Sequence, residues 1–96
     1  MFKLQLPQQI VYYSDADEAN FFRWLQQVPA VKDVKGGPSG LEVAVNVPID
    51  DDSLRELIAL LTRYSLEKDS LRHLLTPENE HWFRKKGMYW FESVFT

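Results

Sequence analysis

The chain has 96 residues, no cysteine, and 14 acidic against 11 basic side chains, which gives a formal net charge of −3. This length fits one domain, and the lack of cysteine excludes disulfides and thiolate chemistry. With this excess of acidic side chains, the chain lacks the broad positive field that nucleic-acid partners require. No apolar run approaches the ~20 residues that cross a bilayer. Since the pattern of a secretory signal is missing as well, we expect a single cytoplasmic domain over residues 1–96 that has no membrane partner.

The first residues have the pattern of β-strands. Apolar and polar side chains alternate over residues 2–6, which is the period of a strand buried on one face. Pro7 interrupts the pattern because proline cannot donate to a β-ladder. Residues 10–13 are apolar and aromatic and are strand-like too. The sequence therefore leaves open whether residues 2–13 contain one strand or two.

Two amphipathic helices are predicted. Ser14 has the side chain of an N-cap and is followed by acids that favour the positive first turn, and this helix should end before Pro29. The second helix begins after Asp50, where Ile49 can pack against the first turn. The apolar faces are Phe21, Leu25 and Val28 in the first helix, and Leu54, Leu57, Ile58, Leu60, Leu61 and Tyr64 in the second.

A hairpin is predicted between the two helices. Residues 31–35 have a weak strand pattern, and residues 36–40 are glycine, proline and serine, which suit a tight turn. Residues 41–47 alternate between branched apolar residues and Glu, Ala or Asn, which is the clearest strand pattern in the chain. Pro48 ends this strand.

The order strand, helix, strand, strand, helix matches five of the six elements of a ferredoxin-like βαββαβ domain. A right-handed crossover through the first helix places strand 1 beside strand 3, with strand 2 outside. We therefore predict an α+β fold with a ferredoxin-like βαββα core over residues 1–64. This core would be a three-stranded mixed sheet with two helices on one face.

Residues 65–96 are predicted to form a helical, aromatic C-terminal extension where a sixth strand would stand. Residues 66–75 look helical, and Thr76-Pro77 restarts a helix that ends with the basic residues 84–86 before Gly87. Residues 88–95 fit a short helix better than a strand, because their aromatic and apolar side chains recur four residues apart.

The titratable residues give only weak signals of chemistry. His81 stands beside Glu80, a pair that could supply a general base or part of a metal site, but the three or four ligands of a zinc site are missing. The three acids of residues 50–52 are explained by a helix start, and the glycine-rich residues 36–40 precede a strand rather than a phosphate-binding helix. We therefore predict no catalytic residue, no cofactor and no metal.

A partner-binding surface is predicted in the C-terminal extension, where six of the thirteen aromatic residues fall within the last 16 positions. Basic and aromatic side chains together can bind single-stranded nucleic acid, can dock as a structural cap, or can form the centre of a protein interface. We expect the interface. Its predicted residues are Trp82, Arg84, Lys85, Lys86, Tyr89 and Trp90.

These observations favour a small non-enzymatic protein that acts by binding another protein. An immunity-type or antitoxin-type inhibitor of a bacterial toxin is a concrete version, because an acidic protein suits a basic partner. A homodimer that buries Tyr89, Trp90 and Phe95 is an alternative partner arrangement. A nucleic-acid-binding ferredoxin-like module, and a small enzyme or enzyme subunit using His81 and Glu80, are the alternative functions.

Overall fold

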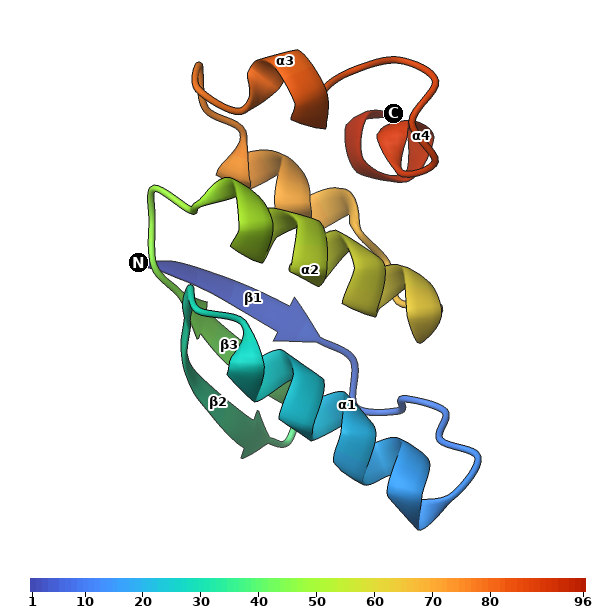
Figure 1. The fold of residues 1–96 in the computed structure, drawn as a ribbon. Coiled ribbons are helices and arrows are strands. Elements are labelled where there is room, and N and C mark those ends of the chain that lie inside the picture. The colour runs from blue at the N-terminus through green and yellow to red at the C-terminus, as the bar shows by residue number, and fades with distance from the viewer.

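Three antiparallel strands form the sheet of this small α+β protein, whose computed structural model describes residues 1–96 (Figure 1). The strands lie in the order β1-β3-β2, so strand 1 is beside strand 3 as predicted. The prediction of a mixed sheet is wrong. β1 and β2 run in the same direction, but β3 separates them, and each neighbouring pair is therefore antiparallel. The strands are β1 (Phe2–Leu6), β2 (Val31–Gly37) and β3 (Gly40–Val45).

The register of β1 and β3 fixes which side of the sheet is buried. Leu4 pairs with Val43, and both side chains face the core. The side chains two residues away along each strand, such as Leu6 and Val45, face the core as well.

The central strand ends at Val45, earlier than its sequence pattern predicts, because both neighbouring strands begin there: Phe2 of β1 and Val31 of β2 pair with Val45. Val47, expected to be in the strand, lies beyond the ladder and is 48% exposed.

Residues 10–13 do not form a strand, so the segment 2–13 contains only β1. They belong to the irregular segment that connects β1 to the first helix. Ile10 and Tyr12 pack against the core, whereas Val11 and Tyr13 are exposed. This alternation imitates a strand in the sequence, although the segment has no ladder partner.

Both long helices begin at the predicted caps. In α1 (Asp15–Gln27) the hydroxyl oxygen of Ser14 accepts a hydrogen bond of 3.1 Å from the Asp17 N–H. In α2 (Asp51–Arg63) a carboxylate oxygen of Asp50 accepts one of 3.0 Å from the Ser53 N–H. These bonds satisfy N–H groups that have no partner inside the helix. Both caps confirm the sequence prediction.

The C-terminal extension is helical, in three short pieces. They are the 3₁₀ helix η1 (Asp69–Leu74), α3 (Glu80–Phe83) and α4 (Phe91–Phe95). The helix that the sequence predicts from Thr76 is reduced to the single turn of α3. Across the turn that precedes it, Thr76 and Asn79 bond reciprocally in the manner of a capping box, each backbone N–H donating to the other side chain.

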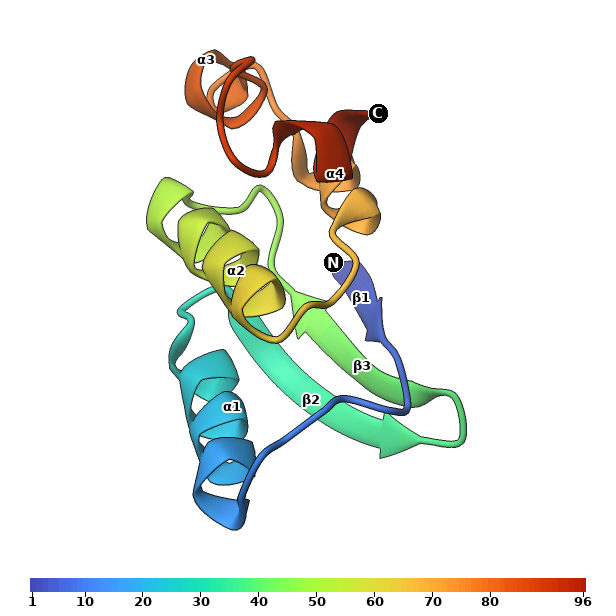
Figure 2. The ribbon, with the colours of Figure 1, turned by 90° about the vertical axis from the view of Figure 1, so that its right-hand side faces the viewer.

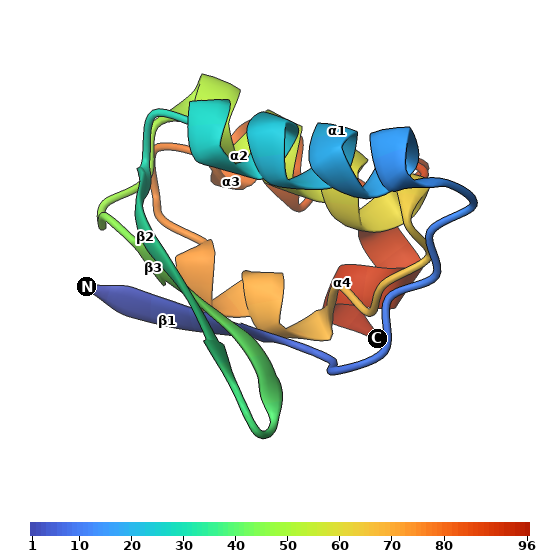
Figure 3. The same cartoon turned by 90° about the horizontal axis from the view of Figure 1, so that it is seen from below.

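Both parts of the chain share one core. A single cluster of 20 buried apolar side chains extends from Leu4 in β1 to Val94 in α4. In two perpendicular views, α2 lies between α1 and the C-terminal helices α3 and α4 (Figures 1 and 2), which explains why its buried face is so broad. Viewed from below, η1 lies near β1 (Figure 3), and the rings of His73 and Phe2 are 6.2 Å apart. None of the helices has the length and apolar character needed to cross a membrane.

Candidate functional site

The structure divides the six residues of the predicted C-terminal surface between the core and the exterior. Trp90 is only 5% exposed, and its indole Nε1 donates a hydrogen bond of 2.7 Å to the carbonyl oxygen of Phe83. Its ring also lies edge-on to Trp82, with 6.0 Å between the ring centres. Trp90 is therefore a core residue, and its side chain is not available to a partner.

The other predicted residues stay at least partly accessible. Trp82 is half-buried beneath the guanidinium of Arg55, which lies 4.1 Å from the centre of the indole ring. Tyr89 is 62% exposed and rests edge-on against Trp90. Arg84, Lys85 and Lys86 are exposed as well, in the segment that joins α3 to α4. A partner surface made of these residues stays a prediction.

The structure distributes the histidine and glutamate residues singled out in the sequence over exposed positions of two elements. His81 and Glu80 are exposed in α3 and make no side-chain hydrogen bond or ion pair. His73 lies in another element, η1, against Phe2. No group of three or more histidine or acidic side chains is arranged to hold a metal ion.

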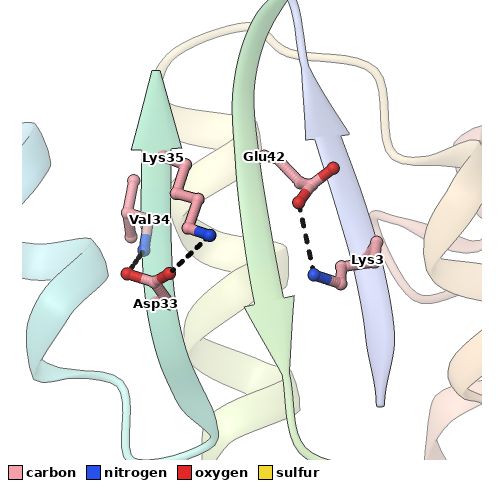
Figure 4. Close-up of polar contacts among 5 residues, drawn as sticks. All are labelled: Lys3, Asp33, Val34, Lys35 and Glu42. Carbon is pink, nitrogen blue, oxygen red and sulfur yellow. Dashed lines mark hydrogen bonds and ion pairs between the residues drawn. The ribbon is translucent and has the colours of Figure 1, made fainter. Parts of the chain in front are cut away.

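The solvent-facing side of the sheet carries alternating charges (Figure 4). Lys3 in β1 forms an ion pair of 3.3 Å with Glu42 in β3. In β2, Lys35 lies 3.9 Å from Asp33, which also accepts the N–H of Val34. Each of these two positive charges thus lies close to a negative one. The strands present no aromatic ring on this face on which a nucleic-acid base could stack.

A groove of about 730 Å³ lies where the segment before α1 meets α1 and the end of α2. We call it the loop–helix groove. Its rim contains the most exposed large side chains of the region, Tyr13 at 92% and Val11 at 65%. The residues that line it are Gln9, Val11, Tyr13, Asp17, Asn20, Trp24, Arg63, Tyr64, Ser65 and Leu66.

Asp17 connects the three segments that form the loop–helix groove. One carboxylate oxygen accepts a hydrogen bond of 3.0 Å from the hydroxyl of Tyr64 at the end of α2. The other accepts one of 2.9 Å from the backbone N–H of Tyr13. Burial, followed by the bond to Asp17, raises the pKa of Tyr64 above its ordinary value. This tyrosine therefore keeps its proton, and with it the bond, well into the alkaline range.

A second aromatic–carboxylate pair lies beside the same groove. The indole Nε1 of Trp24 in α1 donates a hydrogen bond of 2.8 Å to Glu56 in α2. This bond fixes the orientation of the indole ring along one wall of the groove. The groove thus has aromatic walls whose positions are set by carboxylates.

The sequence pattern does not indicate this groove. It predicts that Asp17 is one of the acids in the first turn of a helix and that Tyr64 belongs to the apolar face of α2. The two residues are 47 positions apart, and nothing in the local pattern indicates that they meet. The available signal was the pair Tyr12-Tyr13 directly before a helix, where two adjacent rings cannot both face the core of an extended segment.

Comparison with known proteins adds no assignment. No family model, curated protein or solved structure matches the chain. The loop–helix groove combines a concave shape, exposed aromatic side chains and a carboxylate, and it is the strongest candidate site.

Proposed function

We propose that this is a non-enzymatic binding protein that forms a complex with another protein through the loop–helix groove. The observation that carries the proposal is the exposure of Tyr13 and Val11 on the rim of that groove. Tyrosine and tryptophan are enriched at the energetic centres of protein interfaces, and clustered exposed apolar side chains mark interaction sites. A concave groove between such side chains fits a protruding side chain of a partner.

The net charge supports a basic partner. With a formal charge of −3, the protein attracts positively charged surfaces and accelerates their encounter. We propose an inhibitor of the immunity or antitoxin type as the concrete form of this function. Such proteins act by occupying a surface of the protein they inhibit and need no chemistry of their own.

We further infer that residues 1–64 represent a ferredoxin-like arrangement without its last strand. The element order β1-α1-β2-β3-α2 and the strand order β1-β3-β2 support this inference. In that arrangement the fourth strand would lie beside β1. Here η1 contributes His73 to a contact with Phe2 of β1.

The proposed function is tested by capture from an extract of the cells that encode the chain, followed by native mass measurement. We expect one stoichiometric complex with a different protein. A Tyr13→Ser/Val11→Ser double variant should lose this complex while keeping the wild-type unfolding midpoint, because both side chains are exposed. Tyr89→Ser is the matched control, since it removes an exposed ring from the C-terminal surface instead.

Two results would contradict the proposal. The first is a protein that runs as a monomer or a homodimer alone under all capture conditions. The second is a complex that survives the double variant and is lost with Tyr89→Ser, which would move the interface to the C-terminal surface.

A further inference from the structure

Two aromatic side chains of the loop–helix groove have their polar hydrogens engaged by carboxylates. Tyr64 donates its hydroxyl hydrogen to Asp17, and Trp24 donates its indole N–H to Glu56. Because these donors are engaged, the two residues offer a ligand their π faces and, at Tyr64, the acceptor positions of the hydroxyl oxygen. The carboxylates, as ionised groups, offer only further acceptor positions. Ring faces and free acceptor positions both attract a cation.

The carboxylate of Asp17 has capacity left for such a ligand. It accepts two hydrogen bonds, from Tyr64 and from the Tyr13 N–H, and an ionised carboxylate has about four acceptor positions. Asp17 belongs to none of the three ion pairs in the structure. The groove therefore contains an acid that is held in place by neutral donors and lacks a cationic partner.

The lining of the groove carries one charge of each sign, from Asp17 and Arg63, and neither side chain belongs to an ion pair. Glu56, which accepts the indole N–H of Trp24, adds a second carboxylate beside the groove. Asp17 is therefore the lining group with which a basic side chain would pair, and Glu56 adds to the attraction.

We propose that the loop–helix groove binds a lysine or arginine side chain of a partner protein, with Asp17 pairing the positive charge and Tyr13 and Trp24 packing against it. This inference rests on the proposed function and specifies the chemistry of the contact. The apolar stem of the basic side chain would pack along Val11, as long basic side chains do when they bury the stem and keep the charged end at a polar site.

The inference can be tested with defined probes before any partner is known. The ¹⁵N-labelled protein is titrated at low salt with N-acetyl-arginine amide and N-acetyl-lysine amide, and N-acetyl-glutamine amide serves as the neutral control. We expect saturable shifts of the Trp24 indole N–H and of the backbone N–H groups of Tyr13 and Asp17. Equal shifts with the neutral probe, or no saturation up to about 50 mM, well above millimolar dissociation constants, would overturn the proposal.

Variants locate the site within the acidic surface. Asp17→Asn keeps an oxygen that can accept the Tyr64 hydroxyl and should weaken binding of the cationic probes about tenfold or more, since a hydrogen bond to a charged group is lost. Asp15→Asn removes an exposed acid two residues away, outside the lining, and should leave binding unchanged. Equal weakening by both variants would show general charge attraction and contradict a built site.

A second variant tests the site independently, in case Asp17→Asn impairs folding. Tyr13 is 92% exposed, so Tyr13→Leu keeps the fold while it removes one aromatic wall. We expect a loss of binding of about two- to fivefold, the range for an exposed cation–π contact. Unchanged binding in Tyr13→Leu, together with unchanged binding in Asp17→Asn, would place the cation elsewhere.

The two proposals fail in distinguishable ways. If the cationic probes bind at the groove and no protein complex is captured, the proposed function is wrong and the cation site stands. If a complex is captured that Asp17→Asn does not weaken, and the probes produce no shifts at Trp24, the partner uses another chemistry and this inference is wrong.

Discussion

The indole Nε1 of Trp90 donates a hydrogen bond of 2.7 Å to the carbonyl oxygen of Phe83 and thereby connects the last two helices of the chain. Both side chains are buried, with Phe83 fully inaccessible. The bond explains how a tryptophan of the aromatic C-terminal extension belongs to the core. Its ring supplies apolar area, and its N–H satisfies a carbonyl that would otherwise be buried without a partner.

Replacement of Trp90 by phenylalanine should therefore destabilise the protein. The unpaired carbonyl of Phe83 costs about 1–3 kcal/mol, and the lost ring volume adds to it. Trp82→Phe is the matched control, because the Nε1 of Trp82 is buried without a hydrogen-bond partner. That variant should cost less than about 1 kcal/mol, since no bond is lost. Urea unfolding measures both, and equal destabilisation would show that the Trp90 bond contributes nothing.

Gly40 at the start of β3 should not tolerate a side chain. Its φ is +120°, and a Cβ atom there would lie 2.1 Å from the carbonyl oxygen of Leu6. Gly40→Ala should cost at least about 1–3 kcal/mol from backbone strain alone. At Gly36, in the same hairpin, a Cβ atom meets nothing within 4 Å, so Gly36→Ala should leave stability unchanged or raise it by up to about 1 kcal/mol. Thermal unfolding of the pair tests the hairpin geometry directly, and similar melting temperatures would contradict it.

Ser53 connects the start of α2 to the end of the α1–β2 connection. Its hydroxyl oxygen accepts a hydrogen bond of 3.1 Å from the backbone N–H of Ala30, and the side chain is fully buried. Ser53→Ala should cost about 1–3 kcal/mol, because the Ala30 N–H is left buried and unpaired. Ser39→Ala, in the exposed hairpin turn, should change stability by less than about 0.5 kcal/mol. Amide exchange at Ala30 gives a second measurement, and unchanged protection of that N–H in Ser53→Ala would contradict the role of the bond.

The parts of the fold that depend on neighbouring residues could be predicted from the sequence. Ser14 and Asp50 cap their helices through bonds to residues three positions later, so both helix starts are visible as local patterns. The apolar period of α2 likewise predicts its buried face. The segment 10–13 was ambiguous for the same reason, since alternate burial has the same pattern in a loop and in a strand.

The candidate site depends on residues that are distant in the chain, and the sequence could not indicate it. Asp17 meets Tyr64 across 47 positions, and Trp24 meets Glu56 across 32. For the predicted C-terminal surface, the sequence overestimates how many aromatic rings are exposed. Trp90 is buried, because it packs against Trp82 and donates a hydrogen bond to the carbonyl of Phe83. Which rings are buried is decided by how the short helices meet, and local periodicity does not report that.

The bond between Tyr64 and Asp17 predicts a loss of stability in alkaline solution. Burial raises the pKa of Tyr12 and Tyr64 above the ordinary value of 10.0, with Asp17 adding to the effect at both. The folded state thus binds these protons more tightly than the unfolded state, and the stabilisation is complete below pH 10.0 and lost as the pH rises through the folded pKa values. Free energies of unfolding measured in urea from neutral to alkaline pH should fall in that range.

Tyr64→Phe should lower the stability at neutral pH by about 0.5–1.5 kcal/mol, since the bond to Asp17 is lost, and should make the alkaline decline shallower. The lower stability at neutral pH and the shallower alkaline decline both result from loss of the hydroxyl proton of Tyr64, so they should appear together. Tyr89→Phe removes an exposed hydroxyl that makes no hydrogen bond in the structure, and it should keep both the neutral stability and the full alkaline decline. If Tyr64→Phe declines as steeply as the wild type, the proton of Tyr64 is not held by Asp17, and the carboxylate in the groove is oriented by the Tyr13 N–H alone.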